Sequence, residues 1–173
     1  MILDLGCGYD KSRYEKGALT VDIDARAEPD VVHDLDKYPY PFEDGSIDKI
    51  MISHCLEHLE DPVRFLEESY RLLKFGGILV IRVPHFSSAT SFNSLVHKHS
   101  FGVTTFLSQY SDHYMFVQKS VKLNYCAYRT TWKRKLLNVL PSFLANLNPR
   151  YCERLWCYWV GGFSEIEYVL MKV

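Results

Sequence analysis

The chain has 173 residues, of which 47% are hydrophobic and 24% are charged, a size and composition typical of one globular domain with a buried core. These values exclude a disordered chain, a collagen and a small disulfide scaffold, and no apolar run approaches the roughly 20 residues of a transmembrane helix. The five cysteines form no CxxC pair and no signal peptide pattern is present, so we expect reduced thiols in a cytoplasmic protein.

Charge is distributed unevenly along the chain. Residues 1–82 carry 17 acidic and 10 basic side chains, a net charge of −7, whereas residues 83–173 carry 4 acidic and 10 basic ones, a net charge of +6. No linker rich in Pro, Gly or Ser separates the halves, so we expect one domain over residues 1–173 whose halves face different partners. A basic wall from the second half would suit a ligand that carries phosphate or carboxylate groups. The alternative is that the positive charge only balances the acidic half or faces solvent.

The first half alternates short apolar strands with helical stretches, the pattern of a parallel sheet with crossover helices. Pro62 stands in the first turn of an amphipathic helix, which Gly76 and Gly77 are predicted to end. Such apolar strands suit a sheet covered on both faces. The predicted strands lie at residues 2–5, 18–23, 31–32, 49–53 and 78–83.

The second half is less periodic and holds two predicted strands, at residues 120–128 and 164–173. Between them, a helical and aromatic insertion covers about residues 130–160. Its basic residues stand beside leucines and tryptophans, so residues 132–159 either lie at a membrane interface or form a flap over the sheet with a solvated basic face. The cluster is small and the pI of about 6.6 is low, so we expect no nucleic-acid partner.

Residues suited to binding a nucleotide follow three strands. Gly6 and Gly8 end the first, where the backbone turns and a ligand can approach without a Cβ in the way. Asp22 ends the second, the position at which Rossmann-type sites hydrogen-bond ribose hydroxyls. Asp34 follows the third, where an acceptor can meet an adenine amino group. These strand ends share one edge of the sheet, so together they predict an adenosine-binding site.

Several motifs resemble the class I S-adenosylmethionine-dependent methyltransferases, in particular a compact type-11-like group often associated with polysaccharide and glycolipid biosynthesis. The resemblance implies a Rossmann-like three-layer α/β/α sandwich, a seven-stranded sheet with an antiparallel last strand, and here no N-terminal cover helices. The motifs are LDLGCG at 3–8, TVDID at 20–24, SHCLEHLEDP at 53–62, RLLKFGGILVIRVPHF at 71–86 and HKHSFGVTTF at 97–106.

The resemblance also implies S-adenosylmethionine as the cofactor. Its methionine and ribose would lie along the glycine motif, its adenine beyond the second and third strands, and its methyl group near the end of the fourth. Glu57 and His58 match a family triplet and are expected to be structural. The implied cofactor-binding residues are Asp4, Gly6, Cys7, Gly8, Asp22, Ile23, Asp34, Leu35, Ser53 and His54.

His54 and His85 are the candidate catalytic residues. Histidine suits removal of a hydroxyl proton because its unperturbed pKa is about 6.5. The two follow the fourth and fifth strands, so we expect both to open onto one cleft, although each can instead be a hydrogen-bonded structural histidine. An alternative interpretation of His97 and His99 is that they bind a metal together with His85. No Cys or carboxylate stands at ligand spacing nearby, so no metal is predicted.

The sequence thus predicts S-adenosylmethionine-dependent methyl transfer, most simply O-methylation, to a small-molecule, sugar or glycolipid acceptor. The alternative is a non-catalytic cofactor-binding or regulatory module with the same fold. A nicotinamide-dependent dehydrogenase fits poorly because the glycine motif lacks its third glycine. Peripheral membrane contact through residues 132–159 and a homodimer remain open.

Overall fold

The computed structural model describes residues 1–10, 16–107, 116–126, 132–159 and 162–173. Seven strands form one sheet in the order β3-β2-β1-β4-β5-β7-β6. The first five are parallel, and β7 runs antiparallel to both β5 and β6. The predicted sheet is therefore confirmed, including its antiparallel last strand. The strands are β1 (Ile2–Leu5), β2 (Leu19–Asp22), β3 (Val31–Val32), β4 (Ile47–Ser53), β5 (Leu73–Pro84), β6 (Phe116–Asn124) and β7 (Glu165–Lys172).

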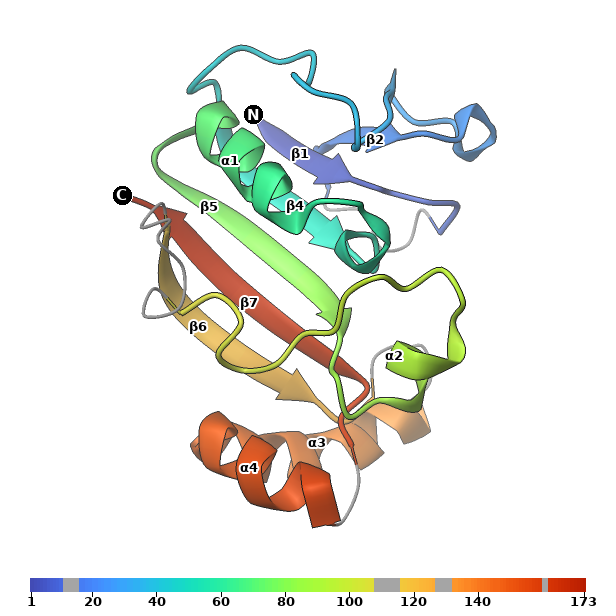
Figure 1. Cartoon of the computed structure of the whole chain (residues 1–173), viewed down its shortest axis with the longest axis vertical. Coiled ribbons are helices and arrows are strands. Elements are labelled where there is room, and N and C mark those ends of the chain that lie inside the picture. Colours follow the sequence, from blue (N-terminus) through green and yellow to red (C-terminus); the bar gives the residue numbers. More distant parts are fainter. Residues whose placement is uncertain (11–15, 108–115, 127–131, 160–161) are drawn as a thin grey trace.

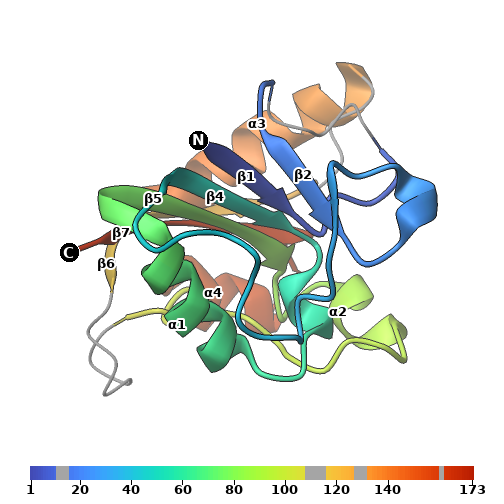
Figure 2. The ribbon, with the colours of Figure 1, turned by 90° about the horizontal axis from the view of Figure 1, so that it is seen from above.

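Helices cover the two faces of this sheet, with α1 on one side and α3 on the other (Figures 1 and 2). The central strands carry apolar residues on both sides, and Leu3, Leu5, Ile50, Ile52, Leu79, Ile81 and Val83 are almost fully buried, as a sheet between two layers requires. Among the described residues, none of the helices is long and apolar enough to cross a bilayer. The helices are α1 (Pro62–Leu72), α2 (Ala89–Asn93), α3 (Trp132–Leu147) and α4 (Pro149–Trp159), with short 3₁₀ turns η2 (Ala25–Ala27) and η3 (Leu56–His58).

The glycine pair does not end α1, contrary to the sequence prediction. The backbone becomes extended at Leu73, with φ −69° and ψ 142°, and β5 begins there without a turn. Gly76, with φ +77°, instead lies inside β5 where the register slips, since Ile47 pairs with Leu73 but Lys49 pairs with Ile78. The glycines therefore mark a bulge in the strand rather than a helix end.

The strand predicted at 120–128 is displaced toward the N-terminus, because β6 starts at Phe116 and ends at Asn124. Residues 127 and 128 lie outside the described residues. Beyond the end of the strand, side chains of α3 accept hydrogen bonds from the backbone N–H groups. Asn138 Oδ1 accepts the Cys126 N–H at 2.8 Å, and Ser142 Oγ accepts the Tyr125 N–H at 3.0 Å.

Asn146 on α3 hydrogen-bonds to both backbone groups of one β6 residue, as a neighbouring strand would. Its Oδ1 accepts the Leu123 N–H and its Nδ2 donates to the Leu123 carbonyl, both at 2.9 Å. Since β6 is an edge strand, a helix that satisfies its open backbone groups protects an edge at which other chains could pair.

We expect Asn146→Ala to lower the free energy of unfolding by about 1–3 kcal/mol, because it leaves backbone groups of β6 without their partner. Urea denaturation measures this change. Leu147→Ala, at a neighbouring position where the side chain is exposed, is the control and should shift stability by less than about 0.5 kcal/mol. Equal stability of the Asn146 variant and the parent would contradict the edge-covering role of α3.

Candidate functional site

The glycine motif forms a tight loop at the end of β1. Gly6 and Gly8 have φ of +68° and +62°, the left-handed region that glycine adopts without strain. A Cβ on Gly6 would lie 2.4 Å from Cys55 Sγ, so the loop packs directly on the segment after β4. A Cβ on Gly8 would meet no protein atom within 4 Å. Gly6 is thus required by packing, whereas Gly8 borders open space that a ligand can enter.

Asp22 ties this loop to the end of β2. Its Oδ2 accepts the Gly8 N–H at 2.8 Å, and its Oδ1 accepts the Asp24 N–H at 2.9 Å. Each carboxylate oxygen can accept a further hydrogen bond, so Asp22 can also receive ribose hydroxyls. The next side chain, Ile23, is 64% exposed and offers an apolar surface beside the carboxylate. This pairing suits the ribose and adenine of a nucleoside.

The third strand end has a different character from the one that the sequence predicts. Asp34 begins a turn, with its Oδ1 accepting the Asp36 N–H at 3.0 Å. Leu35 is buried in the core, and its carbonyl accepts a hydrogen bond from the Tyr40 hydroxyl at 2.7 Å. The Leu35 side chain therefore supports the glycine loop from below and does not face a ligand.

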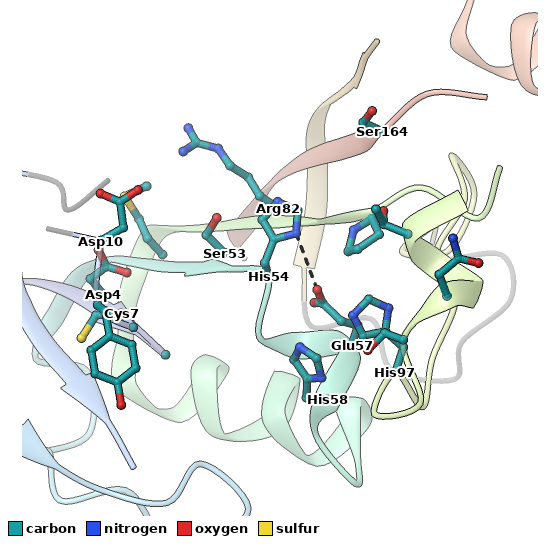
Figure 3. Close-up of a pocket in the computed structure, with 18 of the residues that line it drawn as sticks. Asp4, Cys7, Asp10, Ser53, His54, Glu57, His58, Arg82, His97 and Ser164 are labelled. Carbon is teal, nitrogen blue, oxygen red and sulfur yellow. Dashed lines mark ion pairs between the residues drawn. The ribbon is translucent and has the colours of Figure 1, made fainter. Parts of the chain in front are cut away.

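A cavity of about 940 Å³ opens beside the glycine loop at the carboxyl ends of β1, β4 and β5. Figure 3 shows Asp4, Cys7 and Asp10 at one end and Glu57, His58 and His97 at the other, with Ser53, His54 and Arg82 between them. Six of the residues predicted to bind the cofactor line it: Asp4, Gly6, Cys7, Gly8, Ser53 and His54. The other four, Asp22, Ile23, Asp34 and Leu35, do not line this cavity.

His54 faces the cavity from a left-handed turn directly after β4. Its φ of +52° is uncommon for a residue other than glycine and lets the chain leave the strand for η3. Burial would by itself lower its pKa, but hydrogen bonds to Glu165 and Glu57 outweigh this effect and raise the pKa to about 9. The ring lies 3.0 Å from Glu165 Oε2 through Nε2 and 3.6 Å from Glu57 Oε1 through Nδ1.

Glu165 is a residue of this network that sequence reasoning missed. It is the first residue of β7 and pairs with Pro84 at the end of β5. Its second oxygen accepts a hydrogen bond from Asn124 Nδ2 at 2.8 Å, which extends the network to β6. The signal was available in the predicted topology, because the start of an antiparallel last strand meets the carboxyl ends of the parallel strands.

The structure places His85 away from the cavity, although the sequence predicts that it opens onto the same cleft as His54. The His85 ring is fully buried, with Nδ1 2.6 Å from Ser87 Oγ and Nε2 3.1 Å from Glu153 Oε1. The same Glu153 oxygen accepts the Val103 N–H at 2.6 Å. Nε2 therefore fastens α4 to the loop after β5, while Nδ1 makes its contact within that loop.

The family of the chain follows from its first half and from its fold. Residues 3–81 match the family described as methyltransferase domain. The whole chain also superposes on a S-adenosylmethionine-dependent methyltransferase from Archaeoglobus fulgidus, with a TM-score of 0.63 and 22% sequence identity over 99% of this chain and 85% of that one. The matched domain, together with this fold, supports a class I S-adenosylmethionine-dependent methyltransferase. The cofactor that goes with this fold is S-adenosylmethionine.

Two further relatives of this methyltransferase carry a stated activity. A geranyl diphosphate C-methyltransferase from Streptomyces coelicolor, solved with Mg²⁺, geranyl diphosphate and S-adenosyl-L-homocysteine, superposes with a TM-score of 0.64 at 16% identity, covering 99% of this chain and 72% of that one. A ubiquinone/menaquinone biosynthesis C-methyltransferase from Xanthomonas campestris is 35% identical over 88 residues, which are 47% of this chain and 34% of that protein. The chain spans about a third or less of the length of the curated relatives it matches.

We expect His85→Ala to destabilise the protein by about 2–4 kcal/mol, because it empties a fully buried position and removes a partner of Glu153. Thermal and urea unfolding measure this loss. Binding of S-adenosylmethionine by the folded variant should equal that of the parent, since His85 does not line the cavity. As a control, His33→Ala, which removes a more exposed histidine, should cost less than about 1 kcal/mol. Loss of cofactor binding with unchanged stability would contradict the anchoring role.

Proposed function

We propose that this methyltransferase binds S-adenosylmethionine along the edge formed by β1, β2 and β4 and transfers the methyl group to a small-molecule acceptor in the adjoining cavity. The observation that carries the proposal is the double hydrogen bond of the Asp22 carboxylate to Gly8 and Asp24 beside the cavity. These hydrogen bonds hold the Asp22 carboxylate, which can accept hydrogen bonds from ribose hydroxyls, beside the open glycine loop.

The predicted cofactor residues divide between the parts of the ligand by their chemistry. Asp22 and Ile23 offer a carboxylate to the ribose and an apolar surface to the adenine, and Asp34 lies at the next strand end. The buried carboxylate of Asp4 lines the cavity and suits the ammonium group of the methionine. In this placement the sulfonium methyl group points toward Ser53 and His54, the residues in the middle of the cavity in Figure 3.

For the chemical step, the protein has to align the acceptor with the methyl group for an in-line displacement. His54 faces the cavity and is held by two carboxylates, so we assign to it the orientation of the acceptor, and His85 has no part in this step. We propose O-methylation of a sugar or glycolipid hydroxyl. The wall around His54 is polar, with Arg82, Ser53 and Glu57, and offers both donors and acceptors to such a hydroxyl.

A second proposal concerns where the acceptor is held. The helices α3 and α4 expose an apolar surface that includes Trp132, Leu136, Leu137, Val139, Leu140, Phe143, Leu144, Leu147, Tyr151, Leu155, Trp156, Tyr158 and Trp159. Every charged residue of these two helices is basic except Glu153, which faces inward to His85. Leucines and aromatic rings beside basic residues fit an anionic bilayer surface. We propose that these helices dock on it and bring the cavity to a lipid-linked acceptor.

We expect Gly8→Val to weaken S-adenosylmethionine binding by at least about 100-fold while the domain stays folded. The new side chain fills the open space beside the loop, where no protein atom lies within 4 Å of its Cβ, and at a φ of +62° it also strains the loop that holds the ligand. Calorimetric titration measures the binding, and circular dichroism checks the fold. The control is Gly45→Val, which introduces the same strain at a glycine with φ +60° and an equally open Cβ position, away from the cavity. Parent-like affinity of the Gly8 variant would place the cofactor elsewhere.

We expect the protein to sediment with vesicles that contain phosphatidylglycerol and to remain in solution with pure phosphatidylcholine. Leu140→Glu and Trp159→Glu should abolish sedimentation, because each places a negative charge on the exposed apolar surface. Lys122→Ala, on the exposed side of β6, changes the net charge by the same amount and is the control. Absence of binding to anionic vesicles, with a concentration-dependent dimer that the Leu140 variant dissolves, would assign the surface to a second copy of the chain instead.

A further inference from the structure

Three side chains with metal-binding atoms meet at one end of the cavity. Glu57 and His58 come from η3, and His97 comes from the segment that follows α2. The ligand atoms of all three lie within 4.8 Å of one another. Figure 3 shows them together at the end of the pocket opposite Asp4 and Cys7.

Two side-chain atoms of these residues are buried without a hydrogen-bond partner in the part of the chain that the structure describes. They are Glu57 Oε2 and His97 Nδ1. The Glu57 side chain is only 2% exposed, so bulk solvent does not reach this oxygen. A buried carboxylate oxygen that is left unsatisfied costs several kcal/mol, and a bound cation removes that cost.

The surrounding hydrogen bonds hold the cluster in place. His58 Nδ1 donates to the Val96 carbonyl at 3.1 Å, which leaves the Nε2 lone pair for a ligand. The Lys98 N–H donates to the Glu57 carbonyl at 2.8 Å, and His99 Nε2 lies 3.0 Å from the Leu59 carbonyl. Hydrogen bonds from a ligating imidazole to a backbone carbonyl are typical of the outer shell of metal sites. The two segments are therefore fixed against each other before any ion binds.

We propose that Glu57, His58 and His97 bind a divalent transition-metal ion of the zinc class. Two imidazoles and one carboxylate form a donor set that zinc uses with a fourth position open to a ligand. With bonds of roughly 2.1 Å and tetrahedral angles, two ligand atoms on one ion lie about 3.4 Å apart, so a pair separated by 4.8 Å has to close by about 1.4 Å. Rotation of the half-buried His58 and His97 side chains supplies such a movement.

Glu57, His58 and His97 line the same cavity as His54, so an ion held by them would be accessible from that cavity. There it would hold an oxygen of the acceptor, a hydroxyl or a phosphate, opposite the methyl group. This role depends on the proposed methyl transfer, whereas the binding of the ion does not.

The test is titration of the chelator-treated full chain with Zn²⁺ by calorimetry and with Co²⁺ by visible absorption. We expect one equivalent of either ion to bind, with ligand-field bands for Co²⁺. Glu57→Gln and His97→Ala should each weaken binding at least about 100-fold, and His33→Ala, remote from the cluster, should not change it. If His97→Ala does not fold, as shown by circular dichroism, His97→Gln replaces it.

Absence of stoichiometric binding to the parent, or parent-like affinity of the folded His97 variant, would overturn the metal site. S-adenosylmethionine is titrated separately in the presence of the chelator. Cofactor binding without metal binding leaves the proposed function standing and removes the metal site. Metal binding without cofactor binding leaves the metal site standing and removes the proposed function.

Discussion

Five parallel strands end at one edge of the sheet, and β7 begins at that same edge because it runs antiparallel to β5. This arrangement brings the loop after β1, the turn after β4 and the first residue of β7 to one cavity, although Gly8, His54 and Glu165 are far apart in the sequence. An all-parallel sheet would place the start of the last strand at the opposite edge and leave His54 without its buried carboxylate partner. The direction of a single strand therefore decides which charges face the cavity.

Hydrogen-bonded carboxylates do most of the positioning at this edge. Asp22 fixes the glycine loop, Glu165 fixes the imidazole of His54, and Glu153 fixes that of His85. A buried carboxylate is costly unless its oxygens are satisfied, so each of these contacts constrains the backbone around it. Glu57 differs from them because Oε2 has no such contact among the described residues, and the same reasoning points there to a ligand outside the chain.

Much of the sheet could be predicted from the sequence, because apolar runs and strand-end glycines are local signals. The β2 and β4 strands differ from their predicted bounds by at most two residues. The predictions that were wrong concern residues whose contacts lie far away in the sequence. Gly76 looks like a helix stop until the register with β4 shows a bulge. His54 and His85 each follow a strand, and only the position of Glu153 on α4 shows that one is anchored and the other faces the cavity. The pairing of His97 with Glu57 crosses 40 positions, so a search for nearby ligands in the sequence could not find it.

The charge asymmetry of the chain has its explanation in the same geometry. If the positive half formed the acceptor wall, its lysines would line the cavity, but among the described residues no lysine does. Lys119 and Lys122 are exposed on β6, and five of the other basic residues belong to α3 and α4. The cavity itself has carboxylates at both ends, with Asp4 and Asp10 near the glycine loop and Glu57 at the far end, and Arg82 is its one arginine or lysine among the described residues. An acidic lining of this kind suits the sulfonium of the cofactor, yet it repels an acceptor phosphate unless a cation intervenes. The surplus positive charge of the second half therefore lies outside the cavity, and a metal ion bound by Glu57, His58 and His97 would add to the positive charge that Arg82 supplies inside.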